Sequence, residues 1–189
     1  MFNEYIIPTV INEVDILKDN KLKIHNELKP QLWLENPKDL LSIKFLEILE
    51  SFNIPCVVCI IFFKPKNYVE TFAHIDYQTK TLIQTHAFNI ITQGVDSTMS
   101  WYEKKLDNSS WDLPLTKQDV PHLSYKVESC NLKFSYKLPL HQLMLVNTSM
   151  LHVINVSQES RLCVSLRTGL VFPTWYSAAQ HFSYLFDKS

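Results

Sequence analysis

Between Ile54 and about Leu170 the sequence consists of short runs rich in β-branched and aromatic residues, and this pattern restricts the possible folds more than any other feature. Each run has the length of a strand, and turn-forming residues separate the runs. Eight or so strands at this spacing predict a β-sandwich or a barrel. The runs are Cys56 to Phe63, Glu70 to Tyr77, Leu82 to Thr92, Thr98 to Glu103, Leu123 to Val127, Leu132 to Leu138, Leu143 to Asn147, Leu151 to Val156 and Arg161 to Thr168.

Two helices are expected to flank the strands. Asn36 is a suitable N-cap and Pro37 suits the first helical position, and apolar residues then recur at helical spacing as far as Phe52. A second amphipathic helix is predicted over 174–186, with Thr174 as its cap.

Composition is that of one soluble domain, expected to span residues 1–189 with its core at about 54–170, because 189 residues with 46% hydrophobic content can bury a core. The formal charge of -1 and the lack of a long basic run argue against a nucleic-acid partner. The apolar run at 54–63 is interrupted by Pro55 and is too short to span a bilayer, and the N-terminus does not resemble a secretory signal. We therefore expect a cytoplasmic protein without membrane contact.

Four cysteines are present, and none has the spacing of a disulfide framework. Cys56 and Cys59 form a Cys-x-x-Cys, but strand alternation would direct the two thiols to opposite faces. We expect reduced, buried, structural thiols. Gly94 and Gly169 are the two glycines of the whole chain, which excludes a glycine-rich phosphate loop.

One His-x-Asp triplet, His74-Ile75-Asp76, lies within a predicted strand, where alternation places His74 and Asp76 on one face. His152 lies in a distant apolar run and would join them from another strand. Two histidines and one carboxylate can hold one face of an iron(II) ion and leave the opposite face open for oxygen chemistry. The triplet alone is a weak pattern, so the prediction depends on its surroundings. His86 is an alternative ligand, although no carboxylate accompanies it at strand spacing.

Only two of the 18 basic residues are arginines, Arg161 and Arg167, and both follow His152. A guanidinium group can bind a carboxylate through two parallel hydrogen bonds, which lysine cannot do. Alternation along 161–168 places both arginines and Ser165 on one face, so Arg161 and Ser165 can hold one carboxylate together. Arg167 is the alternative anchor.

The triplet, the later His152, Arg161 nine residues beyond it and Ser165 on the same strand resemble the iron(II)/2-oxoglutarate-dependent oxygenases over roughly residues 70–170. Three flanking segments are similar to small stand-alone members related to aspartyl/asparaginyl hydroxylases, including phage-type ones. These segments are Ala87-Phe88-Asn89-Ile90-Ile91, Ser100-Trp101-Tyr102-Glu103, and Leu145-Val146-Asn147-Thr148 through His152-Val153-Ile154-Asn155 and Arg161.

The resemblance implies a mainly β protein with a double-stranded β-helix, a cupin-like jelly roll, between N-terminal and C-terminal helices. It implies iron(II) bound by the triad and the distal carboxylate of 2-oxoglutarate bound by Arg161 and Ser165, with Asn89 and Trp101 lining the cosubstrate or substrate pocket. The implied activity is that of a hydroxylase-type dioxygenase. Such an enzyme uses O2 to oxidise a C–H bond of an amino-acid, peptidyl or small-metabolite substrate and releases succinate and CO2.

Two other functions remain open. A cupin-type enzyme would use the same metal ligands without a keto acid, and a non-catalytic jelly-roll module would keep the metal for stability or for ligand capture. The polar segment from Lys104 to Pro121 is expected to form a lid or a substrate-facing loop.

Overall fold

The computed structural model of the protein describes residues 3–12, 17–18, 31–34, 36–39, 41–76, 83–105, 115–117 and 120–186. Its helices are α1 (Ile43–Ser51) and α2 (Trp175–His181), and short 3-10 helices lie at Pro37–Asp39, Val127–Ser129 and Ser183–Leu185. The strands are β1 (Ile6–Asn12), β2 (Gln31–Leu34), β3 (Val58–Lys64), β4 (Phe72–His74), β5 (His86–Gln93), β6 (Ser97–Lys104), β7 (Leu115–Lys117), β8 (Val120–His122), β9 (Ser124–Lys126), β10 (Cys130–Lys137), β11 (Gln142–Asn147), β12 (Leu151–Val156) and β13 (Arg161–Arg167).

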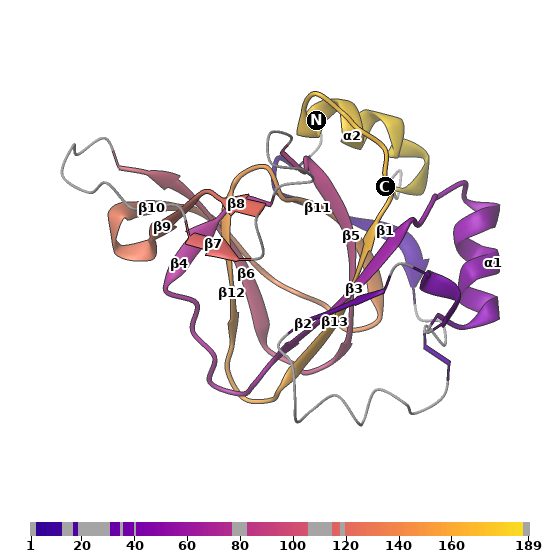
Figure 1. Cartoon of the computed structure of the whole chain (residues 1–189), viewed down its shortest axis with the longest axis horizontal. Helices are drawn as coiled ribbons and strands as arrows, with labels where there is room; N and C mark the ends of the chain where they lie inside the picture. The colour runs from indigo at the N-terminus through magenta and orange to yellow at the C-terminus, as the bar shows by residue number, and fades with distance from the viewer. Residues whose placement is uncertain are drawn as a thin grey trace.

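Two antiparallel sheets pack face to face (Figure 1). One has the strand order β1-β11-β5-β13-β3-β2, the other has the order β10-β6-β12-β4-β9, and β7 and β8 form a separate pair. From β3 to β13 the strands of the two sheets alternate along the chain, except that β6, β9 and β10 all belong to the five-stranded sheet. This alternation makes a jelly roll, which confirms the predicted fold class.

Strand alternation sorts the apolar side chains into layers. On β13, Leu162, Val164 and Leu166 face outwards and pack in one cluster with residues of α1 and α2, which cover the six-stranded sheet (Figure 1). Cys163 points the other way and packs between the sheets, in a second cluster that includes Trp101. The inner face of β13 is thus the face on which Arg161, Ser165 and Arg167 were predicted to lie together.

The first helix begins later than the sequence predicted. Asn36 precedes only the 3-10 turn at Pro37–Asp39. Leu41 then forms an isolated antiparallel bridge with Leu17, and an extended residue cannot continue a helix. Helix α1 starts after Ser42, whose hydroxyl caps it by accepting a backbone hydrogen bond at 3.1 Å.

The second helix confirms the prediction at its start, because the Thr174 hydroxyl accepts a hydrogen bond from the backbone N–H of Ser177 at 3.1 Å.

Four strands, β1, β2, β7 and β8, were not predicted. β1 and β2 are edge strands of the six-stranded sheet, so they depend on neighbours that lie far away in the sequence. Most of the expected lid at 104–121 lies outside the described residues.

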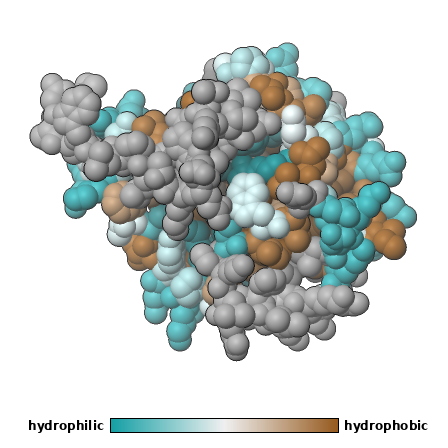
Figure 2. Space-filling view, viewed as in Figure 1, coloured by the Kyte–Doolittle hydropathy of each residue, from teal (hydrophilic) through white to brown (hydrophobic). Residues whose placement is uncertain are grey.

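Apolar and polar residues are interspersed over the described part of the face seen in Figure 2. Large exposed apolar side chains, such as Trp33 on β2 and Tyr176 on α2, come from different elements, as is usual for surface positions. Within the parts of the chain that the structure describes, no helix has both the length and the apolar character needed to cross a bilayer.

Candidate metal centre

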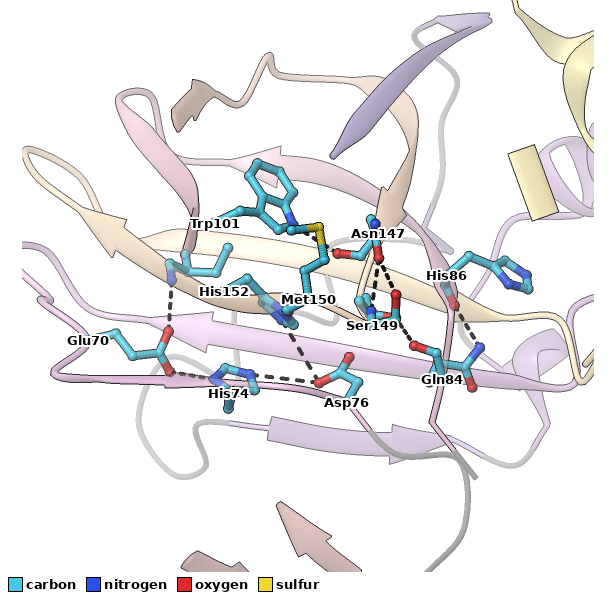
Figure 3. A network of polar contacts seen from close by, with 12 residues as sticks. Glu70, His74, Asp76, Gln84, His86, Trp101, Asn147, Ser149, Met150 and His152 are labelled. Atoms are coloured by element: carbon cyan, nitrogen blue, oxygen red, sulfur yellow. Dashed lines mark hydrogen bonds and ion pairs between the residues drawn. The ribbon is translucent and has the colours of Figure 1, made fainter. Parts of the chain in front are cut away.

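Three potential metal ligands meet on the inner side of the five-stranded sheet (Figure 3). His74, the last residue of β4, lies directly opposite His152 of β12, and the centroids of the two rings are 4.5 Å apart. Asp76 Oδ1 lies 3.7 Å from His74 Nε2 and 4.0 Å from His152 Nε2. The structure therefore brings the three predicted ligands together, although they come from segments far apart in the sequence.

Asp76 does not lie on the same strand as His74, contrary to the sequence-based expectation. β4 ends at His74, and the backbone N–H of Asp76 donates to the carbonyl of Thr148 at 3.1 Å, while the Asp76 carbonyl accepts from the backbone N–H of Gln84 at 2.9 Å. Asp76 is thus fixed by the segments that precede β12 and β5. These bonds, and not strand alternation, aim its carboxylate at the two imidazoles.

The spacing of these ligands suits a divalent cation. Imidazole nitrogens and carboxylate oxygens that bind an ion at about 2.1 Å lie about 3 Å from one another when they occupy adjacent positions. The separations of 3.7 and 4.0 Å would therefore shorten by roughly 1 Å around an ion. Three ligands alone would leave the remaining coordination positions of an ion to other molecules.

His152 is prepared to act as a neutral ligand. Its Nδ1 lies 2.9 Å from the carbonyl of Met150, which can only accept, so Nδ1 carries the proton and the Nε2 lone pair faces Asp76. Burial, together with the nearby His74, lowers the pKa of His152 to about 4. The ring is thus neutral at neutral pH, the form that binds a metal.

Arg167 is the ionic partner of Asp76. Its Nη2 donates to Asp76 Oδ2 at 2.8 Å, while Oδ1 of the same carboxylate faces the histidines. Burial raises the pKa of Asp76, but Arg167 and the two histidines outweigh burial and hold that pKa well below its usual value. Asp76 is therefore ionised, with one oxygen held by Arg167 and the other available to a metal.

Glu70 lies behind His74, on the side away from Asp76 (Figure 3). Glu70 Oε1 is 3.8 Å from His74 Nδ1 and 3.3 Å from the ammonium group of Lys64, and Oε2 accepts from the backbone N–H of Ile154 at 2.8 Å. The sequence analysis missed Glu70 and Lys64. A signal for Glu70 was present, because alternation places it on the same face as His74 within the predicted strand over 70–77.

A row of buried polar atoms without hydrogen-bond partners leads away from Asp76 along the inner faces of β13 and β5. Among the described residues, these atoms are Arg167 Nη1, Ser165 Oγ, Asn89 Oδ1 and Arg161 Nε. Ser165 and Asn89 are directly paired across the two strands. Buried polar groups in proteins normally have partners, so this row fits a polar ligand that binds next to the metal ligands.

Three other predicted residues are now placed. Trp101 is fully buried opposite His152, and its indole N–H donates to the carbonyl of Asn147 at 2.9 Å, so its polar group is already satisfied by the protein. His86 is not part of the cluster, because it faces the helices and lies 3.0 Å from the Thr168 hydroxyl. Burial raises the pKa of the Cys56 and Cys59 thiols to about 12, and both are free. Cys59 is buried as predicted, whereas Cys56 is only partly buried and precedes β3.

Comparison with known proteins gives distant structural likenesses and no match in sequence. The sequence matches no family model, and a search of curated proteins gives no significant match. A crystal structure from work on prolyl 4-hydroxylases of Phytophthora capsici has a TM-score of 0.39 to this chain at 12% identity. The match covers 87% of this chain and 60% of the other, so the chain spans about three-fifths of that protein's length. What defines the molecule is its jelly roll and its cluster of two histidines and one carboxylate.

Proposed function

We propose that this protein is an iron(II)/2-oxoglutarate-dependent dioxygenase of the hydroxylase type. The observation that supports the proposal is the row of unpaired buried polar atoms on β13 and β5, which starts beside the His74-Asp76-His152 cluster. The three metal-ligating residues alone would suit any cupin-like enzyme. The adjoining row adds hydrogen-bonding groups and positive charge where a small anionic cosubstrate bound to the metal would extend.

Arg161, assisted by Ser165, is the proposed anchor for the distal carboxylate of 2-oxoglutarate. Arg161 is 2% exposed and Ser165 is 1% exposed, and each has a buried polar atom without a partner among the described residues. Their Cα atoms are separated by about 13 Å along the strand, which an extended arginine and a bound carboxylate can bridge. Arg167, the alternative anchor, already binds Asp76. This engagement favours Arg161.

The remaining residues have distinct tasks in this mechanism. His74, Asp76 and His152 would hold iron(II), which together with the keto acid and O2 supplies the oxidising chemistry when bound. Asp76 is kept ionised and oriented by Arg167, and the Met150 carbonyl fixes the tautomer of His152. Asn89 would donate or accept a hydrogen bond with the cosubstrate. Trp101 would pack against His152 in the core, and its buried ring would exclude water from that side of the metal ligands.

The substrate would approach the open side of the cluster. We propose a C–H bond of an amino-acid, peptidyl or small-metabolite substrate, with succinate and CO2 as the products of the cosubstrate. Asp76 occupies the carboxylate position, and its presence favours hydroxylation over reactions that require an additional anion at the metal.

The test begins with binding. Calorimetry on protein loaded with Mn²⁺, which is stable in air, should show 2-oxoglutarate binding, and Arg161→Met should weaken this binding by about tenfold or more because a charge-assisted hydrogen bond is lost. Anaerobic addition of iron(II) and 2-oxoglutarate to the wild type should give a visible charge-transfer band. Metal binding without keto-acid binding would refute the proposal and favour the cupin-type enzyme. Keto-acid binding without succinate release in the presence of O2 and a metabolite mixture would favour a binding module.

A further inference from the structure

Two cations face each other on the inner side of the six-stranded sheet. Lys64 of β3 is directly opposite Arg161 of β13, and the pair beside them, Phe62 and Cys163, packs between the two sheets. Like charges in directly opposed positions destabilise a sheet. Arg161 is almost fully buried and the side chain of Lys64 is 15% exposed, so water screens their repulsion poorly.

Within the described part of the chain, Glu70 is the carboxylate that forms an ion pair with Lys64, with its Oε1 3.3 Å from Lys64 Nζ. Burial lowers the pKa of Lys64, Glu70 raises it, and Arg161 lowers it further. Glu70 thus offsets the charge of Lys64, whereas Arg161 has no ion pair among the described residues and its Nε has no hydrogen-bond partner there. The site therefore carries an excess positive charge that a second carboxylate would neutralise.

Glu70 is also shared in a second way. The oxygen that Lys64 contacts, Oε1, is the one that lies 3.8 Å from Nδ1 of His74, a separation too long for a hydrogen bond. Glu70 Oε2 is held by the backbone N–H of Ile154 at 2.8 Å, so the carboxylate can pivot about this bond. Lys64 and His74 thus compete for a single oxygen.

We propose that Lys64 joins Arg161 in binding the distal carboxylate of 2-oxoglutarate, and that this releases Glu70 Oε1 to accept a hydrogen bond from Nδ1 of His74. The inference rests on the proposed function and adds a coupling to it. A carboxylate behind a metal-bound histidine fixes the orientation of the ring and makes it a stronger ligand. Filling the cosubstrate site therefore strengthens the metal centre through the protein, in addition to any direct contact between cosubstrate and metal.

The coupling predicts opposite effects on two affinities when Lys64 is replaced. Lys64→Met should weaken 2-oxoglutarate binding to the Mn²⁺-loaded protein by about tenfold or more, since a charge-assisted contact is lost. The same variant should bind Mn²⁺ alone more tightly than the wild type, by a few-fold, because Glu70 is free to bind His74. Mn²⁺ affinity is measured from the electron paramagnetic resonance signal of the free ion, and keto-acid affinity by calorimetry.

Matched controls separate this role from a general loss of charge. Lys66→Met removes an exposed cation two residues away and should change neither affinity. Lys64→Arg should retain 2-oxoglutarate binding. The affinity for 2-oxobutyrate, which lacks the distal carboxylate, should be equal in the wild type and in Lys64→Met.

A second variant tests the coupling with Lys64 intact. Glu70→Gln should leave the affinity for Mn²⁺ alone nearly unchanged, because Glu70 does not yet bind His74 in that state. With saturating 2-oxoglutarate, the same variant should weaken Mn²⁺ binding by about tenfold or more, because the carboxylate behind His74 is lost. Unchanged 2-oxoglutarate affinity in Lys64→Met, with the wild type binding normally, would overturn this inference and leave the proposed function standing. A wild type that binds Mn²⁺ but no 2-oxoglutarate would overturn both. Parallel weakening of both affinities in Lys64→Met would reveal structural damage and overturn the coupling.

Discussion

Removal of the Arg167 guanidinium should expose how strongly the protein depends on its bond to Asp76. The two groups are 2.8 Å apart, and their side chains are only 14% and 19% exposed. An exposed ion pair contributes about 0–1 kcal/mol, whereas loss of one partner from a fully buried pair costs about 3–5 kcal/mol. For this mostly buried pair we expect Arg167→Met to lower the free energy of unfolding of the metal-free protein by about 2–3 kcal/mol.

A double-mutant cycle measures the interaction itself. Arg167→Met, Asp76→Asn and the double variant are unfolded with urea at neutral pH without metal, and the double variant should be more stable than the sum of the single effects by about 2 kcal/mol. Arg161→Met combined with Asp76→Asn is the control, because no contact joins Arg161 to Asp76 in the described structure, and these effects should add.

Metal binding supplies a second reading of the same pair. A metal ion bound to Asp76 neutralises the carboxylate in place of Arg167, so saturating Mn²⁺ should restore much of the stability that Arg167→Met loses. A coupling energy below about 0.5 kcal/mol, equal to that of the Arg161 control, would refute the idea that Arg167 holds Asp76. So would a loss of stability in Arg167→Met that persists undiminished in Asp76→Asn.

Three further predictions concern stability. Burial holds the pKa of His86 at about 4, below its ordinary value of 6.5, so the unfolded chain takes up the proton first as the pH falls. The contribution of His86 to the free energy of unfolding should be full above pH 6.5 and should fall by up to about 3 kcal/mol towards pH 4. Urea unfolding of His86→Gln should therefore show a shallower loss of stability over this range, and an unchanged pH dependence would contradict the role of His86. Gly94 has φ +94°, and an added Cβ would lie 2.5 Å from the Ser160 carbonyl oxygen and 2.9 Å from Arg161 Cα. Gly94→Ala should cost about 2 kcal/mol and also weaken 2-oxoglutarate binding, and a variant as stable as the wild type would contradict this. Thr174→Ala should lower the melting temperature through loss of about 1 kcal/mol at the start of α2, whereas Thr174→Ser should have little effect.

Local pattern was sufficient where a feature depends on neighbouring residues. Alternation predicted β12 with its observed bounds and placed Arg161 and Ser165 on one face of β13, where the structure has them. The cap of α2 was equally readable, because Thr174 and Ser177 lie within one turn. The start of α1 was predicted too early in the chain, because the bridge between Leu41 and Leu17 is a contact that no local pattern reveals.

The sequence by itself determined the chemistry that is available: the two histidines and the aspartate, two arginines on one strand face, and the period-2 pattern from which a jelly roll can be built. Only the tertiary structure decided how these groups are paired. It fixed Asp76 beyond the end of β4, joined it to Arg167, and set Lys64 against Arg161 with Glu70 between Lys64 and His74. The physical reason is that alternation fixes the face of a side chain along its own strand, whereas its partner depends on the register between strands that are distant in the sequence.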